Sequence, residues 1–212
     1  MKKLFYSVAL LAATMIGFVS CDEEEEKPDF RDQAIGEYNV TLKQYYAIEN
    51  SDADEYTLYT MESVMKASGA TDCPDLSKQF TATLSKDGEG LKLTATSVFS
   101  DEWTFVKLAE ASNGFTFDIK EYEAVVDNAG TKAKFTNYPG AKLGDVKYNG
   151  LYTNGVLKFN LKDNGEMEKA IWKPLTDDAD AFAAFQEKIK GSELEKVLTD
   201  GDVILQFTCT KK

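Results

Sequence analysis

The sequence contains no histidine, the side chain on which most catalysis and metal binding at neutral pH depend. Nucleophile pairs of serine or cysteine with histidine therefore cannot form, and imidazole ligands for zinc are excluded. Two facing carboxylates can hydrolyse a glycosidic bond, but 36 acidic residues produce many chance pairs, so no particular pair is singled out. We predict a noncatalytic protein, with a carboxylate-based hydrolase as the alternative.

Three further segments have residue types that suit chemistry. Ser63 and Lys66 match the spacing Ser-x-x-Lys of penicillin-interacting enzymes, whose chemistry needs the pair on a helix of a large α/β domain with a Lys-Thr-Gly strand. We expect neither feature here. Residues 52–55 and 163–166 offer carboxylates that suit calcium, but neither has the spacing of an EF-hand loop. Both are interpreted as solvated turns, so the sequence predicts no catalytic residue, no metal and no cofactor.

Cys21 has the most informative surroundings of the three cysteines. Lys2 and Lys3 form a short basic start, and the residues at 4–19 are mostly apolar. A serine directly precedes Cys21. A stable membrane span needs about 20 apolar residues, so this shorter run suits a cleaved signal peptide. The segment resembles the lipobox of bacterial lipoproteins, which implies a signal peptide at 1–20 and a diacylglycerol on Cys21; an ordinary signal peptide is the alternative.

An unbroken acidic run, DEEEE, follows Cys21 at positions 22–26. Like charges repel one another and bury no apolar surface, so we predict that residues 21–33 form a solvated, disordered tether. The run resembles the acidic export signal of surface lipoproteins of the Bacteroidetes. That resemblance implies an anchor in outer-membrane lipid through N-terminal acyl chains, with the protein facing the cell exterior. A plain polar linker is the alternative.

The charge of the chain restricts its partners. The net charge is −12 at pH 7, so nucleic acids and anionic head groups are expected to be repelled. Arg31 is the only arginine, and it lies beside the predicted tether, so guanidinium recognition of phosphate or carboxylate is nearly excluded. Ligands are restricted to neutral, apolar or cationic species.

Cys73 and Cys209 remain after lipidation of Cys21. In an oxidising envelope compartment, a leftover pair is a candidate disulfide. The alternative is two separately buried thiols, which behave as small apolar side chains. The favoured interpretation is the pair of buried thiols.

Apolar and polar residues alternate along most of the chain, which is typical of antiparallel strands with one face on a core. In this pattern Phe117, Phe159 and Phe207 point inward. The alternating segments are 38–43, 80–85, 91–96, 115–119, 157–161 and 203–209. Turn sequences that favour hairpins separate them: Asp87-Gly88, Asn113-Gly114, residues 127–130, Asn154-Gly155 and Asn164-Gly165.

One helix is predicted near 177–190, capped by Thr176 or Asp177. Its buried stripe consists of Phe182, Phe185 and Ile189, spaced by three and four residues. A second helical turn is expected at 193–198, before the last strand.

Gly36-Glu37-Tyr38 at the start of the first strand and the hairpin at 148–159 resemble the lipocalin-like (calycin-like) lipoproteins of Bacteroidetes. The resemblance covers roughly residues 34–210 and implies one all-β domain at 34–212, an antiparallel meander closed into a barrel with one late helix before the last strand. A β-sandwich is the alternative. Two features differ from true lipocalins: the last strand has no arginine to cover the first-strand aromatic, and the helix precedes that strand. Both argue against a lipocalin-type ligand cavity more than they argue against the barrel.

Trp172 is placed on a predicted strand at 167–173. If Met167 and Ile171 face the core, Trp172 faces outward near Tyr152. Such an outward pair of aromatic rings is suited to stack on a sugar or a partner protein. Packing of Trp172 beneath the late helix is the favoured alternative. Taken together, the sequence indicates a noncatalytic surface module that binds a small apolar molecule, a glycan or a protein, with an accessory subunit of an envelope assembly as the runner-up.

The lipobox generates a direct test. The wild-type protein should incorporate labelled palmitate in cells, and the Cys21→Ser variant should not, because the variant lacks the sulfur that receives the diacylglycerol. Autoradiography of the purified protein measures both. Incorporation that persists in Cys21→Ser would contradict the anchor.

Overall fold

The computed structural model describes residues 28–50, 55–68, 78–95, 102–126, 129–143 and 146–212. The predicted signal peptide, Cys21, the acidic run and Cys73 lie outside these residues. No helix in the described ranges is long and apolar enough to cross a membrane.

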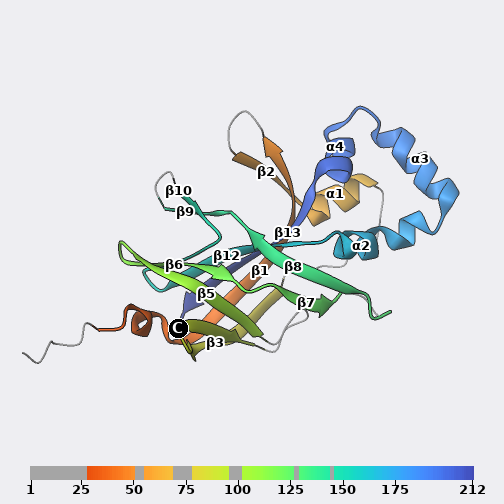
Figure 1. The fold of residues 1–212 in the computed structure, drawn as a ribbon. Coiled ribbons are helices and arrows are strands. Elements are labelled where there is room, and N and C mark those ends of the chain that lie inside the picture. Colours follow the sequence, from red (N-terminus) through yellow and green to blue (C-terminus); the bar gives the residue numbers. More distant parts are fainter. Residues whose placement is uncertain (1–27, 51–54, 69–77, 96–101, 127–128, 144–145) are drawn as a thin grey trace, which may run out of the picture.

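Eight antiparallel strands close into a barrel in which each strand pairs with the next barrel strand along the chain (Figure 1). Around the ring they are β1 (Gly36–Asn50), β3 (Lys78–Asp87), β4 (Gly90–Thr94), β5 (Glu102–Ala111), β6 (Gly114–Ile119), β11 (Gly150–Thr153), β12 (Val156–Asp163) and β13 (Asp202–Lys211). Pairing of β13 with β1 closes the ring. The predicted meander barrel is therefore confirmed, and the β-sandwich alternative is wrong.

Aromatic rings occupy the interior of the barrel. Phe117, Phe159 and Phe207 point inward as predicted, with exposed fractions of 2%, 0% and 0%. The ring of Phe159 stacks on Phe207 at a centroid distance of 4.5 Å and meets Phe105 edge-on at 5.4 Å. Such pairs add to the free energy gained from burial of the rings. The described centre of the barrel is thus a packed core.

The predicted hairpin turns are formed where the ring strands reverse. Asn113 and Asn154 have positive φ angles of 62° and 48°, and Gly155 follows at 79°, which suits tight two-residue turns. Asn164-Gly165 behaves differently, because the chain continues from Gly165 into a helix and not into a strand. Here the prediction of a hairpin is wrong.

Two ring strands are longer than the barrel wall and change partners along their length. β1 pairs with β3 at residues 36–42 and with β2 (Glu55–Thr60) at residues 45–50. β12 pairs with β11 at residues 156–159 and with β8 (Lys132–Tyr138) at residues 160–163. With β7 (Tyr122–Val125) beside β8, these strands form an extension of the sheet beyond the ring. A separate two-stranded sheet consists of β9 (Ala141–Leu143) and β10 (Val146–Tyr148).

Asn137 joins this extension to the barrel. Its side-chain oxygen accepts the Ile119 N–H at 2.7 Å, and its amide nitrogen donates to the Ile119 carbonyl at 2.9 Å. These are the two hydrogen bonds that a neighbouring strand would otherwise supply to the end of β6. One side chain of β8 thus satisfies the backbone of β6 beyond the short strand β11.

A 3-10 helix, η1 (Phe30–Ala34), covers the barrel end where the chain enters. Phe30 packs on Phe115 with ring centroids 5.7 Å apart. The predicted tether at 21–33 is therefore too long, since its last residues are ordered against the core. The physical reason is that Phe30 carries a large apolar ring that the polar pattern around it concealed.

Polar contacts fasten η1 to the barrel. Arg31 pairs with the Asp29 carboxylate at 2.7 Å and donates to the Gly88 carbonyl at 2.7 Å, so the single arginine is structural. The carboxylate of Asp29 has a pKa far below its usual range, chiefly because Arg31 hydrogen-bonds to it. Lys211 pairs in register with Tyr38, and its ammonium donates to the Gln33 carbonyl at 2.8 Å. A lysine of the last strand thus lies beside the first-strand aromatic, where no arginine is available.

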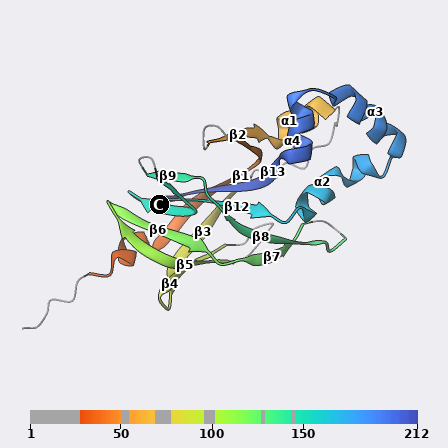
Figure 2. The ribbon, with the colours of Figure 1, turned by 45° about the horizontal axis from the view of Figure 1, so that its top comes forward.

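Four α-helices cover the other end of the barrel, opposite η1 and the C-terminus (Figures 1 and 2). They are α1 (Met61–Ser68), α2 (Glu166–Thr176), α3 (Ala179–Ile189) and α4 (Glu193–Asp200). The single late helix predicted near 177–190 is α3, and the turn predicted at 193–198 is α4. α2 was missed, and the cap of α3 is Asp178 in place of Thr176 or Asp177.

The aromatic core predicts a large effect of one substitution. Phe159→Ala should lower the free energy of unfolding by about 3–5 kcal/mol, because a fully buried ring is lost and a cavity remains. Urea denaturation followed by circular dichroism measures this. Val125→Ala is the control, since Val125 is 50% exposed and its truncation should change the free energy by less than about 0.5 kcal/mol. Equal effects of the two substitutions would contradict the packed core.

The link between β8 and β6 predicts a smaller effect. Asn137→Ala should cost about 1–3 kcal/mol in the free energy of unfolding, because the N–H and C=O of Ile119 lose their partner. Asn39→Ala makes the same change on the exposed face of β1 and should be close to neutral. Amide hydrogen exchange at Ile119 should also become faster in Asn137→Ala only. Unchanged exchange there would show that the two bonds do not hold the strands together.

Candidate functional site

The three helices between β12 and β13 form a layer, called here the helical layer, that begins at a buried carboxylate. Asp163, at the end of β12, is 5% exposed and accepts the Met167 N–H at 2.7 Å. A carboxylate at this position satisfies a free N–H and meets the positive end of the helix dipole. Asp178 and Ser192 cap α3 and α4 in the same way. Short polar side chains thus determine where each helix begins.

Apolar side chains hold the helical layer against the extension of the sheet. Met167, Ile189 and Val197, one from each helix, are almost fully buried and belong to the same core as the barrel interior. The indole nitrogen of Trp172 donates a hydrogen bond to the hydroxyl of Tyr46 on β1. Since both polar groups are buried, the bond fixes the position of α2 relative to β1.

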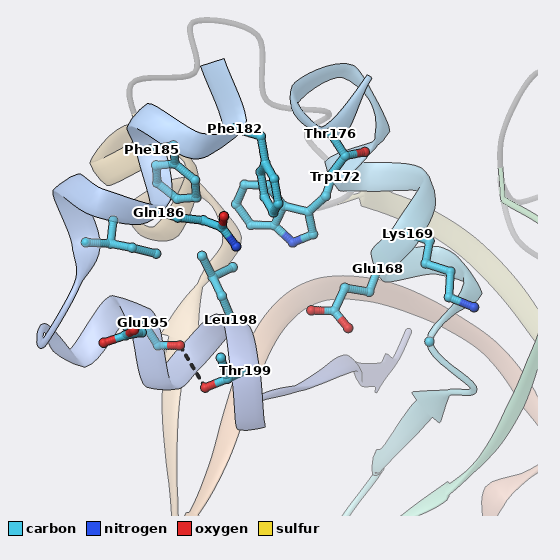
Figure 3. Close-up of a pocket in the computed structure, with 12 residues that line it drawn as sticks. Glu168, Lys169, Trp172, Thr176, Phe182, Phe185, Gln186, Glu195, Leu198 and Thr199 are labelled. Atoms are coloured by element: carbon cyan, nitrogen blue, oxygen red, sulfur yellow. Dashed lines mark hydrogen bonds between the residues drawn. The ribbon is translucent and has the colours of Figure 1, made fainter. Parts of the chain in front are cut away.

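A pocket of about 430 Å³ opens between α2, α3 and α4 (Figure 3). We call it the helical pocket. Most of its wall is apolar, and the lining residues are Gly165, Glu168, Lys169, Trp172, Thr176, Phe182, Phe185, Gln186, Ile189, Glu195, Leu198 and Thr199. Trp172 stacks on Phe185 with ring centroids 6.0 Å apart and forms one side of the pocket. The volume lies within the range of small-molecule sites, about 300–1,000 Å³.

Glu168 is the polar group that stands out in this wall. It comes from the first turn of α2, and its carboxylate lies beneath the Trp172 ring (Figure 3). Burial, together with the nearby carboxylates of Asp163 and Asp202, raises the pKa of Glu168 to about 7. No described side chain pairs with it as a hydrogen-bond donor or a cation. A carboxyl in such surroundings is half charged near neutral pH, which is typical of functional sites.

The other charged residues of the wall are already engaged. Lys169 is directed away from the pocket, and its ammonium pairs with Glu166 at 2.5 Å (Figure 3). The carboxylate of Glu195 accepts the Gly191 N–H at 2.5 Å. Among the described lining residues, Glu168 is therefore the carboxylate left to meet a ligand.

The prediction for Trp172 is corrected by the helix. Residues 167–173 belong to α2 and not to a strand, and Trp172 is 9% exposed beneath α3. Tyr152, its predicted outward neighbour, is 3% exposed and stacks on Phe115 at 5.0 Å. The outward aromatic pair is wrong, and packing beneath the late helix, the favoured alternative, is confirmed.

The remaining candidate residues do not form a reactive centre. Ser63 and Lys66 lie on a helix, α1, but this helix belongs to a β-barrel domain and not to a large α/β domain. Ser63 donates to the Thr60 carbonyl at 2.7 Å, and Lys66 pairs with Glu62. Asp163, within the calcium candidate 163–166, caps α2. Within the described ranges no group of three His, Cys, Asp or Glu side chains is arranged to hold a metal ion.

Cys209 has a free thiol on the inward face of β13. It is 0% exposed, and burial raises its pKa to about 12, so the thiol is inert. Cys73 and the lipidation site Cys21 lie outside the described residues, so their predicted roles stay predictions.

Comparison with known proteins adds no relative. No family model matches the chain, and no curated protein or solved structure matches it either. The fold alone defines the class: an eight-stranded antiparallel meander barrel with helices before the last strand, consistent with a lipocalin-like or calycin-like architecture.

Sequence reasoning missed Glu168 because it missed α2. Pro174 lies in the last turn of that helix, and a proline argues against a helix that continues past it. The available signal was Asp163 four residues before Met167, with acidic residues in the first turn. That pattern is equally compatible with the start of a helix and with a turn.

The raised pKa of Glu168 predicts how stability depends on pH. The folded state favours the protonated carboxyl, so its contribution is fully present below the ordinary pKa of about 4.5 and is lost as pH rises through about 7. Glu168→Gln should therefore melt at a higher temperature than wild type at pH 8 and at about the same temperature at pH 4. Differential scanning calorimetry measures both. The control Glu187→Gln removes an exposed carboxylate of α3 that pairs with Lys190 at 3.3 Å, so it reports the effect of net charge and of one surface ion pair. A Glu168→Gln difference that does not grow with pH would refute the assignment.

Proposed function

We propose that the protein is a noncatalytic binding module that holds a small, largely apolar ligand in the helical pocket. The observation that carries the proposal is the position of this pocket. It is open and lined by aromatic and aliphatic side chains, whereas the described barrel interior is occupied by packed rings. A ligand can therefore bind without disturbing the core.

The arrangement of the reactive residue types supports a role without catalysis. Ser63 and Lys66 have separate partners, and Cys209 is a buried thiol. Hydrolysis by paired carboxylates would need a second carboxylate facing Glu168 across the pocket. Glu195, the other acid of the wall, is directed away and accepts a backbone N–H.

The proposed location is the outer face of the outer membrane, with the protein belonging to the lipocalin-like surface lipoproteins of Bacteroidetes. The lipobox at Cys21 and the acidic run support it. The chain enters the domain at η1, and the helical layer lies at the opposite end of the barrel (Figures 1 and 2). An anchor at Cys21 thus leaves the helical pocket free to face away from the lipid. A net charge of −12 argues against nucleic acid as a partner.

A role as an accessory subunit of an envelope assembly is the second candidate. β2 and β7 are the outer strands of the extension, and each exposes a large apolar side chain. Leu58 on β2 is 43% exposed, and Val125 on β7 is 50% exposed. Edge strands with apolar side chains readily accept a strand of another protein. Crosslinking in cells through these positions tests this version.

The uncharged fluorophore N-phenyl-1-naphthylamine tests the binding proposal on the full mature chain. Its fluorescence should rise on binding to the wild type, because the aromatic wall excludes water from the dye. Gln186→Trp places a large ring at the pocket and should weaken binding by about tenfold or more, a loss of about 1.4 kcal/mol.

Gln79→Trp makes the same exchange on the exposed face of β3 and should leave dye binding unchanged. Saturable binding to the wild type that both tryptophan variants retain would place the site elsewhere. Absence of saturable binding to the wild type would refute the proposal. Turnover of a glycoside, ester or peptide that is abolished by Glu168→Gln would show that the protein is an enzyme.

A further inference from the structure

We infer that the helical pocket selects ligands with an apolar body and a protonated amine, and that the amine pairs with Glu168. The inference rests on the proposed function and specifies the class of ligand. Its starting point is a half-buried carboxylate that lines an apolar pocket and has no partner among the described residues. An ionised carboxylate removed from water is costly unless a cation or hydrogen-bond donors compensate it.

The charged groups that shift the pKa of Glu168 are both acidic. Asp163 approaches it from β12 and Asp202 from β13, and both act on it as negative charges. The lysines nearby are held by other acids: Lys162 pairs with Asp202 at 2.6 Å, and Lys169 pairs with Glu166. Glu195 of α4 adds a further acid to the wall. An anionic ligand would meet repulsion here, whereas a cation is attracted by the whole group.

The aromatic wall fits the remainder of such a ligand. Trp172, Phe182 and Phe185 offer apolar faces to a ring or an aliphatic chain. An ammonium group near these faces also gains from the negative potential above an aromatic ring. The Trp172 indole nitrogen is already bonded to Tyr46, so it does not compete for the ligand. The contact between the ligand amine and Glu168 thus determines the binding specificity.

The titration of Glu168 gives the pairing a pH dependence. Since burial raises the pKa of Glu168 to about 7, the carboxyl is largely protonated at pH 5.5 and largely ionised at pH 8. An amine that stays protonated over this range should therefore bind more tightly at pH 8. Burial also raises the pKa of Asp163, but this carboxylate accepts the Met167 N–H at the start of α2, so the expected pH dependence rests on Glu168.

The test compares two probes of nearly equal shape, 2-(1-naphthyl)ethylamine and 2-(1-naphthyl)ethanol, by isothermal titration calorimetry on the full mature chain. At pH 8 and low salt the amine should bind the wild type about tenfold or more tightly than the alcohol, as expected for a close charge pair. The difference should shrink at pH 5.5.

Glu168→Gln should weaken amine binding by about tenfold and leave alcohol binding within about threefold, which also shows that the pocket is intact. Glu187→Gln, with the same change of net charge on the outer side of α3, should preserve the preference for the amine.

The remaining outcomes would contradict either the inference or the proposed function. Equal binding of amine and alcohol by the wild type overturns the inference and leaves the proposed function standing. A preference that survives in Glu168→Gln also overturns it, because the general negative charge would then be the cause. If neither probe binds, the proposed function itself fails.

Discussion

The need of the long ring strands β1 and β12 for hydrogen-bond partners along both edges explains most of this architecture. β1 and β12 are longer than the barrel wall, so their far ends extend beyond their ring neighbours, β3 and β11. Unpaired backbone groups in a buried strand are costly, and β2 and β8 supply the missing partners. The inner face of this extension then carries apolar side chains that the ring does not cover. The helical layer packs over these side chains. Because this layer consists of separate helices, a pocket remains between α2, α3 and α4.

This division separates the packed core from the open pocket. The aromatic core lies within the ring, where rings such as Phe105, Phe159 and Phe207 contact one another and exclude solvent. The helical layer joins the same core through Met167 and Val197 but keeps one side of its own aromatic residues accessible. A group with an unfavourable environment, the Glu168 carboxylate, lies on that accessible side. An unpaired charge is tolerable there because protonation, water or a ligand can relieve it.

The alternating pattern made the ring predictable. On strands such as β6 and β12 a period of two leaves no choice about which face is buried, and the Asn-Gly pairs set where the hairpins turn. The helical layer was only half predictable. The stripe Phe182, Phe185 and Ile189 identified α3, but Pro174 and the turn-like Asn164-Gly165 concealed α2. Trp172 was therefore assigned to the wrong type of element, and Glu168, on the same predicted strand, was not singled out as a site residue.

The sequence by itself determined the class of fold, the inward face of six of the eight ring strands, the net negative charge and the absence of histidine chemistry. These properties depend on residue types and on short-range periodicity, which one chain displays directly. The tertiary structure alone decided that an open apolar pocket lies in the helical layer and that Glu168, in its wall, has a raised pKa. Both depend on which residues from β12, β13 and the three helices come together, and no local pattern encodes that proximity. The partner strands of β1 and β12 decide it, because they set how far the sheet extends beyond the barrel.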